Sequence, residues 1–298
     1  MMSDLPLDQV RTLLAVVDEQ SFDAAAAVLH VTPSAVSQRV KALEQRTGRV
    51  LLLRTKPVRL TESGQVVVRF ARSLAQLEQD ALGELGFGEE GTRTLTIAVN
   101  ADSLATWFLP ALAAVPEDLG ICFDLQREDQ DHTAALLREG LVMAAVTAAP
   151  QPVQGCTSRR LGRMRYRAMA SPEFIDRRLT GGPLPQLLPT APVIVFDRKD
   201  DLQDRFLRGL TRRRNFTLVR HHIPASESFV DAVAAGLGWG MVPEIQAAPR
   251  GEALVDLAPD RPLDVPLHWQ QWKLDSPGLA TVADAVAKGA KGAKAALR

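Results

Sequence analysis

Residues 21–45 read SFDAAAAVLHVTPSAVSQRVKALEQ and predict two short helices joined by a tight turn. Ser21 is a favourable N-cap for the first helix, and the apolar residues that follow it recur on one helical face. Thr32 offers a second capping oxygen, and Pro33 suits the first position of a helix, where its missing N–H costs nothing. The stretch therefore predicts a helix-turn-helix pair. The alternative interpretation is an amphipathic helical hairpin inside a larger core.

The two sides of the second helix differ in polarity. At about 100° per residue, Val36, Val40 and Leu43 fall on one side. The other side is nearly free of acidic residues and carries Ser34, Ser37, Gln38, Lys41 and Gln45. Arg39 lies at the border between the sides and is a candidate for a phosphate contact. Small hydroxyls and an amide can reach base edges in the major groove, so the polar side is a candidate DNA reader.

Positive charge is concentrated on this helix and on the residues after it. Residues 31–59 hold seven basic residues against one acid, Glu44, a local net charge of +6 in a chain whose formal net charge is zero. Residues 50–53 predict a short strand that pairs back with Leu60 after a basic turn at residues 54–59. Such a hairpin wing would bring three basic side chains to the DNA backbone or minor groove: Arg54, Lys56 and Arg59. A solvated basic loop is the alternative.

Residues 61–85 predict one long helix that Thr61 caps and that the glycines after residue 85 end. Gly64 is expected to be an early weak point of this helix. Its apolar residues step by four, three and four, a seam too narrow for a globular core and suited to a second copy of the helix: Phe70, Leu74, Leu77 and Ala81. We therefore expect a homodimer in which two readers meet two half-sites on DNA.

Strands and helices alternate from residue 92 onward, which predicts an α/β domain. The expected strands are 95–99, 121–126, 143–147, 165–170, 192–196, 217–223, 240–243 and 267–272. The expected helices are 104–114, with Pro110 forcing a kink or a late start, 133–139, 201–212, 226–235 and a last one from Pro277. Two such sets with two crossings predict a clamshell that binds its ligand between two lobes. Residues 288–298, KGAKGAKAALR, are expected to be a frayed tail.

The predicted fold class is thus α/β with three parts. Residues 1–60 form a winged helix-turn-helix DNA-binding domain, residues 61–86 a dimerising linker helix and residues 92–298 an effector-binding domain. Within the last, lobe I takes residues 92–163 and 266–298, and lobe II takes residues 164–265.

Several function classes are disfavoured by what the sequence lacks. It has no GxSxG or HExxH spacing, so we expect neither an enzyme nor a metal or cofactor site. Cys122 and Cys156 are far apart and are expected to be reduced. There is no run of 18 apolar residues and no apolar signal core at the N-terminus, so we expect a cytoplasmic protein away from membranes. An exported amino-acid binder would share the clamshell but would need a signal peptide.

The pattern FDAAAAVLHVTPSAVSQRVKALEQRTG followed by LTESG resembles the winged helix-turn-helix of LysR-type transcriptional regulators. AVNADSLATWFLPAL (98–112), APVIVFDRKDD (191–201) and PASESFVDAV (224–233) are similar to the branch that regulates arginine and lysine export. The resemblance implies a reader, a long dimerising helix and a two-lobed effector domain like that of periplasmic binding proteins. It implies a regulator that binds a double-stranded DNA operator, senses lysine or arginine and activates an exporter gene.

The resemblance leaves several points open. These are the operator, activation or repression, which basic amino acid is sensed, a tetramer in place of a dimer, and contact with RNA polymerase. A LysR-type regulator with another small-molecule effector and a non-regulatory binding protein are the alternative functions.

The family also implies which residues contact DNA and effector. Its reader positions correspond to Pro33, Ser34, Ser37 and Gln38, next to the capping Thr32. Many members carry Gln-Pro where this chain has Pro33-Ser34, so base contacts at these two positions are left open. The effector residues implied by the family geometry are Asn100, Asp102, Ser103, Glu128, Asp129, Thr147, Asp197 and Glu227.

The chemistry of this set fits a basic amino acid. Donors at the helix starts near Ser103 and Ser226 would hold the ligand carboxylate, and the acids would hold its ammonium and side-chain cation. Each acid also has a structural interpretation: Asp102 as a helix cap, and Glu128 and Asp129 as solvated loop acids.

Overall fold

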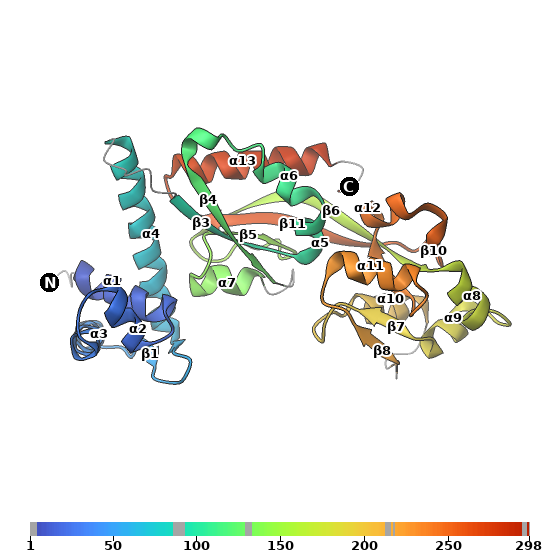
Figure 1. Ribbon diagram of the computed structural model, residues 1–298, viewed down its shortest axis with the longest axis horizontal. Coiled ribbons are helices and arrows are strands. Elements are labelled where there is room, and N and C mark those ends of the chain that lie inside the picture. The colour runs from blue at the N-terminus through green and yellow to red at the C-terminus, as the bar shows by residue number, and fades with distance from the viewer. Residues whose placement is uncertain are drawn as a thin grey trace.

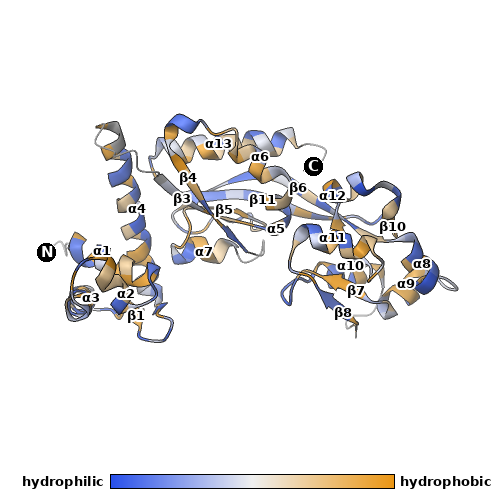
Figure 2. Ribbon diagram, in the orientation of Figure 1, coloured by the Kyte–Doolittle hydropathy of each residue, from blue (hydrophilic) through white to orange (hydrophobic). Residues whose placement is uncertain are grey.

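The computed structural model describes residues 5–85, 93–128, 133–211, 216, 218–293 and 297. Figure 1 shows an N-terminal helical domain, one long helix beside it and two α/β lobes in a row. Hydrophobic residues concentrate in the central strands of each lobe, such as β5 (Ala144–Thr147) and β7 (Val193–Val195), whose residues are all buried (Figure 2). Within the described ranges, no helix is both long enough and apolar enough to cross a membrane.

Three helices and a hairpin form the N-terminal domain: α1 (Leu7–Asp18), α2 (Phe22–Val28), α3 (Pro33–Thr47), β1 (Leu52–Leu53) and β2 (Arg59–Leu60). Both predicted caps are confirmed. Ser21 Oγ accepts a hydrogen bond from Ala24 N at 3.4 Å, and Thr32 Oγ1 accepts one from Ala35 N at 3.2 Å. The apolar faces of the helices close over one core that includes Val10, Leu13, Ala25, Val36, Val40, Leu43 and Leu51.

The wing is fixed to α3 by Glu44. Its Oε1 accepts hydrogen bonds from Leu51 N at 2.8 Å and from Leu52 N at 3.3 Å. The predicted hairpin is confirmed, since Leu52 pairs with Leu60 and Leu53 with Arg59 in antiparallel register. The one acid of the basic region is therefore directed at the backbone of β1.

The linker helix is α4 (Glu62–Glu84), and Thr61 Oγ1 accepts a hydrogen bond from Gly64 N at 3.0 Å, as a cap does. Gly64 lies within this helix and allows a close approach of the chain before β1. A Cβ at this position would lie 2.0 Å from Leu51 O. One side of α4 closes the N-terminal core with Val67, Val68 and Ala71. Phe70 and Leu77 of the predicted seam are each 42% exposed.

The larger sheet runs through both lobes, with the strand order β10-β6-β11-β5-β3-β4 and with β9 also paired to β6. Its strands are β3 (Arg93–Val99), β4 (Ile121–Arg127), β5, β6 (Cys156–Ala170), β9 (Gly240–Pro243), β10 (Val255–Asp256) and β11 (Leu263–Trp272). Strands β4, β3 and β5 are parallel, as the predicted β-α-β unit requires. The lobe I helices include α7 (Thr133–Glu139) and α13 (Pro277–Gly292).

Two long strands, β6 and β11, join the lobes (Figure 1). They pair in antiparallel register from Tyr166 with Leu263 to Cys156 with Trp272, with an irregularity between Leu267 and His268. The expected strands at 165–170 and 267–272 are therefore too short. Residues 157–160 of β6 are exposed polar residues, so this half of the strand shows no apolar run.

Lobe II contains a small parallel sheet of β7 and β8 (Arg220–His222), which continues toward β9 through a bridge from Val193 to Trp239. Its helices are α8 (Pro172–Arg178), α9 (Leu184–Leu187), α10 (Leu202–Leu210), α11 (Ser226–Ala234) and α12 (Glu244–Ala247), with 3₁₀ turns η3 (Leu188–Thr190) and η4 (Ala248–Ala253). Helices α8, α9 and α12 are not among the elements expected from the sequence. The expected strand 217–223 is reduced to β8, and residue 217 lies outside the described residues.

Two helices of lobe I differ from expectation. The helix expected at 104–114 begins earlier, as α5 (Ala101–Ser103), widens to a π-helical turn η1 (Leu104–Phe108) and continues as α6 (Leu109–Leu112), so that it passes through Pro110. The prediction of a frayed tail at residues 288–298 is wrong up to Gly292, because α13 continues to that residue. A Cβ on Gly289 would lie 2.3 Å from the Ala111 Cβ, which shows how closely α13 and α6 pack. Leu297 is also buried and pairs with Met164.

Candidate functional site

The candidate DNA interface lies on the outer side of α3 and on the wing. Five of the predicted contact residues are exposed and two, Ser37 and Arg39, are half-buried; the exposed ones are Thr32, Pro33, Ser34, Gln38 and Lys41. Val36, Val40 and Leu43 are buried on the inner side, as the helical spacing predicts. The side of α3 that carries hydroxyl and amide groups therefore faces solvent.

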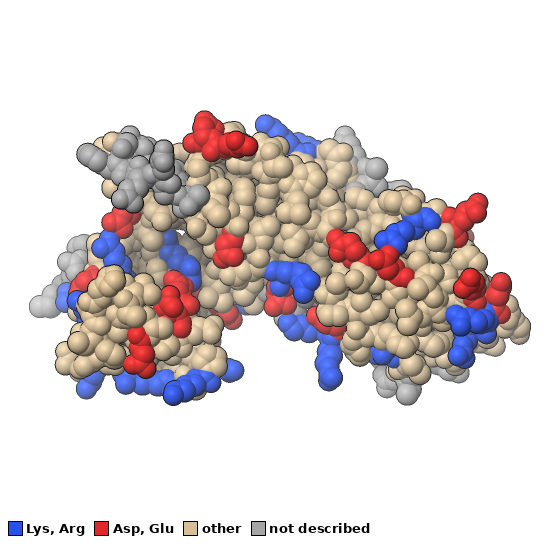
Figure 3. All heavy atoms as spheres, viewed as in Figure 1, with Lys and Arg blue, Asp and Glu red and all other residues tan. Residues whose placement is uncertain are grey.

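The wing adds positive charge next to α3. Arg54, Lys56 and Arg59 are all exposed. The Arg54 guanidinium lies 5.5 Å from the centre of the Phe22 ring, so a cation–π contact ties it to the start of α2. Figure 3 shows basic side chains along the lower edge of the N-terminal domain, at the end that α3 and β1 occupy in Figure 1. A continuous row of basic side chains next to α3 fits contact with a phosphate backbone.

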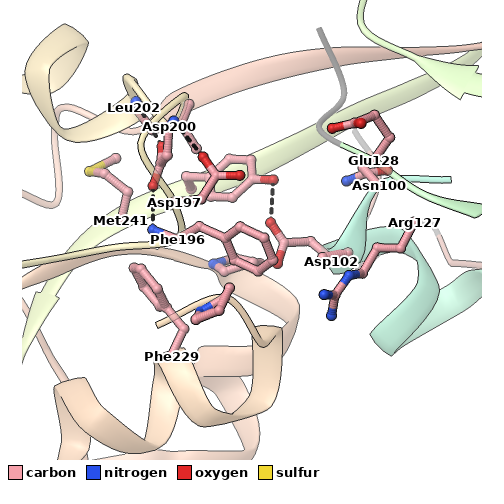
Figure 4. A pocket seen from close by; sticks show the side chains of 14 residues that line it. Asn100, Asp102, Arg127, Glu128, Phe196, Asp197, Asp200, Leu202, Phe229 and Met241 are labelled. Atoms are coloured by element: carbon pink, nitrogen blue, oxygen red, sulfur yellow. Dashed lines mark hydrogen bonds between the residues drawn. The ribbon is translucent and has the colours of Figure 1, made fainter. Parts of the chain in front are cut away.

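The second candidate site is a pocket between the two lobes, with a volume of about 180 Å³ (Figure 4). Residues from both lobes and from β6 line it. Four of them are acidic and one, Arg127, is a permanent cation; the full lining is Asn100, Ala101, Asp102, Arg127, Glu128, Tyr166, Phe196, Asp197, Asp200, Leu202, Pro224, Phe229, Met241 and Pro243. The pocket thus combines an excess of carboxylates with apolar walls.

Asp102 connects three parts of the molecule. Its two carboxylate oxygens accept hydrogen bonds from the Tyr166 hydroxyl at 2.7 Å and from the Ser226 hydroxyl at 2.6 Å. Ser226 begins α11 in lobe II and is also bonded to the Gln246 side chain of α12 at 2.9 Å. Burial raises the pKa of the Asp102 carboxyl above its ordinary value, although the two hydroxyl donors oppose this shift.

Two other acids shape the loop that follows β7. Asp197 Oδ1 accepts hydrogen bonds from Lys199 N at 2.7 Å and Asp200 N at 3.1 Å. Asp200 accepts from Phe196 N at 2.8 Å and from Leu202 N at 3.1 Å. Burial raises the pKa of the Asp200 carboxyl, against these backbone donors. The loop is therefore folded around its own carboxylates, which also face the pocket.

Two charged residues at the end of β4 complete the pocket. Glu128 Oε1 lies 3.1 Å from Lys199 Nζ, so this ion pair crosses from lobe I to lobe II. The Arg127 guanidinium lies 5.8 Å from the centre of the Phe196 ring, which is a second contact between the lobes. A cation is therefore present on the same rim as the acids and could pair with a ligand carboxylate.

The structure brings only part of the predicted effector set to this pocket. Asn100, Asp102, Glu128 and Asp197 line it, and Ser226 reaches its edge through Asp102. Ser103 and Thr147 are fully buried outside the lining, and Glu227 is exposed outside it. Asp129 lies outside the described residues. The assignment of effector contacts stays a prediction.

Sequence reasoning missed three polar lining residues: Arg127, Tyr166 and Asp200. Tyr166 is the one tyrosine of the chain, and Asp200 stands three residues after Asp197, which the resemblance implies as an effector residue. Arg127 immediately precedes Glu128 at the end of an expected strand, where ligand contacts of α/β folds gather.

Comparison with known proteins assigns both parts of the chain. Residues 7–65 match the model of the bacterial regulatory helix-turn-helix protein, lysR family, and residues 88–291 match that of the LysR substrate binding domain. The transcriptional regulator LysG of Mycobacterium tuberculosis is 48% identical over 296 residues, which cover 98% of this chain and 96% of that protein.

A relative and a solved structure from Corynebacterium glutamicum agree with this assignment. A lysine export transcriptional regulatory protein, LysG, is 44% identical over 283 residues, 93% of this chain and 95% of that protein. A solved structure of full-length LysG with bound effector Arg has 41% identity and a TM-score of 0.80, and the match covers 96% of this chain and 98% of that one. The chain therefore belongs to the LysR family of bacterial helix-turn-helix transcriptional regulators.

Proposed function

We propose that the effector of this regulator is a basic amino acid, lysine or arginine, bound in the pocket between the lobes. The observation that carries the proposal is the charge of the lining, where four carboxylates stand against one guanidinium. Placing several carboxylates in one partly buried pocket is unfavourable unless cations neutralise them. A ligand with an ammonium group and a cationic side chain supplies two such charges. The effector Arg bound to a relative of 41% identity supports this choice.

The lining also offers partners for the other groups of such a ligand. Arg127 can hold the ligand carboxylate in a charge-assisted pair. Asn100 Oδ1 is buried and has no hydrogen-bond partner among the described residues, so it can accept a bond from a ligand ammonium. Phe196, Phe229 and Met241 provide apolar walls for the methylene chain. A neutral or acidic amino acid would supply only its α-ammonium, one cation fewer than lysine or arginine.

Effector binding is proposed to act on DNA through the arrangement of the lobes. A ligand shifts a conformational equilibrium only if it binds one arrangement better than the other, and contacts from both lobes give it that preference. Lobe I also touches the linker helix: the Arg69 side chain of α4 donates a hydrogen bond to Arg138 O at the end of α7 at 2.8 Å. Movement of lobe I can therefore change the spacing of the readers.

We infer that the chain acts as a homodimer through α4, with residues 1–60 as reader, 61–86 as linker and 92–298 as effector domain. Phe70 and Leu77 expose apolar surface on the predicted seam, and Leu85, four residues after Ala81, extends it. Two-fold pairing along this seam would cover these side chains. The variant Leu77→Asp should sediment as a smaller species than wild type, whereas Gln79→Asp, at an exposed polar position of the same helix, should not.

The proposed target is an amino-acid exporter gene, with the regulator acting in the cytoplasm as activator; assembly to a tetramer and contact with RNA polymerase are compatible with this role. A mobility-shift assay with the promoter of an amino-acid exporter gene from the same genome tests it. We expect a specific complex whose affinity or mobility changes with lysine or arginine and not with a neutral amino acid. Binding that responds to neither basic amino acid would contradict the proposed function.

A further inference from the structure

One acidic residue of the effector pocket, Glu128, is already paired with a lysine side chain of the same chain. Lys199 Nζ lies 3.1 Å from Glu128 Oε1, and the pair joins the loop after β7 in lobe II to the end of β4 in lobe I. The backbone N–H of Lys199 is held by Asp197 Oδ1 at 2.7 Å. The residue is therefore anchored at its backbone, while its side chain reaches across the cleft and places a primary ammonium on a carboxylate of the pocket.

We propose that Lys199 is a tethered competitor of the effector, whose ammonium holds Glu128 until a cationic nitrogen of the ligand displaces it. This inference rests on the proposed function, because it requires a basic effector. The Lys199 ammonium is the same chemical group as the side-chain end of lysine, so both form the same charge-assisted bond with a carboxylate. A tethered group acts at an effective concentration in the ~mM range, so even a weak pair competes with a dissolved ligand.

The pair is exposed enough to exchange. The Lys199 side chain is 47% exposed and that of Glu128 is 32% exposed. Ion pairs of this exposure are screened by salt and contribute little net stability. The displaced ammonium can move into water without crossing the protein, and no backbone hydrogen bond of the loop has to break. Exchange of one cation for another at Glu128 therefore needs only a side-chain rotation.

The lobes also do not depend on this pair for their connection. The bond from Ser226 to Asp102 joins them at 2.6 Å in a more enclosed place. Strands β6 and β11 continue from one lobe into the other. Loss of the pair between Lys199 and Glu128 thus leaves the two lobes linked. Its main effect is on the occupancy of Glu128, which sets the effector concentration at which the regulator responds.

The opposite role is a clasp, in which Lys199 would hold the lobes closed over the ligand. The two roles predict opposite signs for Lys199→Met, which removes the charge and keeps the length of the side chain. A competitor gives tighter effector binding when it is removed. A clasp gives weaker binding, because the closed arrangement loses a contact.

Calorimetric titration of the full chain with L-arginine and with L-lysine separates these cases. We expect Lys199→Met to bind both amino acids about two- to five-fold more tightly than wild type, the range that one exposed ion pair supplies. Lys199→Arg should stay near wild type because it keeps the cation. Arg198→Met is the matched control, since it removes one exposed positive charge from the adjacent position; its gain in affinity should be smaller.

A second background tests the partner. In Glu128→Gln the competitor has no carboxylate to hold, so adding Lys199→Met should give no further gain in affinity. Weaker binding by Lys199→Met, or a gain no larger than that of Arg198→Met, would overturn the competitor role while leaving the proposed function intact. If the folded wild-type chain binds neither lysine nor arginine, the proposed function is wrong and this inference falls with it.

Discussion

The Ser226 hydroxyl donates a hydrogen bond of 2.6 Å to the Asp102 carboxylate, and this bond joins the two lobes beside the effector pocket. Ser226 stands at the start of α11 in lobe II, whereas Asp102 belongs to the first helix of lobe I. Tyr166, on the strand that runs between the lobes, donates to the other carboxylate oxygen. The Asp102 carboxylate of lobe I is thus hydrogen-bonded both to lobe II and to the strand that connects the lobes.

Ser226→Ala is expected to lower the free energy of unfolding of the effector domain by about 1–3 kcal/mol, because a buried carboxylate loses one of its donors. Denaturant unfolding of the full chain measures this change. Ser228→Ala, at an exposed position on the same helix, is the control and should stay within about 0.5 kcal/mol of wild type. Equal losses for the two variants would mean that the bond to Asp102 contributes nothing specific.

The raised pKa of Asp102 gives a prediction for pH. The folded chain holds this proton more tightly than the unfolded chain, whose value is 3.8. The stability that results is fully present below pH 3.8 and is lost as the pH rises through the folded pKa. Asp102→Asn lacks this titration. The difference between its free energy of unfolding and that of wild type should therefore change across this pH window.

A cationic effector beside Asp102 favours the carboxylate, so arginine binding should release protons at a pH near the folded pKa. Calorimetry in two buffers of different ionisation enthalpy measures the number of protons released. The expected result is a smaller release for Asp102→Asn than for wild type. The same release from both proteins would show that Asp102 does not titrate on binding.

Gly64→Ala is expected to destabilise the N-terminal domain, because its Cβ would stand 2.0 Å from Leu51 O. Overpacking of this kind costs about 1–3 kcal/mol and should appear in thermal unfolding followed by circular dichroism. Gly209→Ala is the matched control: it lies in helix α10 with nothing within 4 Å of its Cβ, and it should leave stability unchanged or raise it. A neutral Gly64→Ala would contradict the close packing of α4 against the wing.

Gln38→Ala and Lys56→Ala should affect DNA binding differently. Gln38 is on the exposed side of α3, so its loss should relax base preference by about 1–3 kcal/mol at one position of the operator. Lys56 is on the wing, so its loss should weaken binding to all sequences alike and reduce the dependence on salt. Mobility shifts on operator and scrambled DNA at two salt concentrations measure both effects. Identical behaviour of the two variants would count against this reader geometry.

The local elements of the reader could be predicted because each depends on residues close in sequence. Caps at Ser21 and Thr32, the proline that begins α3 and the apolar spacing of its inner side all act within one or two turns. The role of Gly64 could not be predicted in this way. Its requirement arises from Leu51, which precedes β1 and approaches α4 only through tertiary packing.

The location of the effector pocket could be predicted from the sequence, but only some of the residues that line it could. The α/β pattern and the acids at strand ends indicate a cleft near Asp102 and Asp197. The register of β6 decides that Tyr166 reaches Asp102, and this register depends on pairing with β11, almost a hundred residues away in the chain. Thr147 illustrates the converse, since a residue at a strand end was expected in the pocket and is buried beside it.

The most direct test of the central claim is calorimetric titration of the full chain with L-arginine and with L-citrulline. Citrulline keeps the shape and length of arginine and replaces its cation with a neutral urea group. If the carboxylates of the pocket recognise a basic amino acid, arginine should bind at least about tenfold more tightly than citrulline, since a lost pair with a buried charge costs 2 kcal/mol or more. Equal affinities for the two ligands, or no binding of arginine at all, would contradict the account.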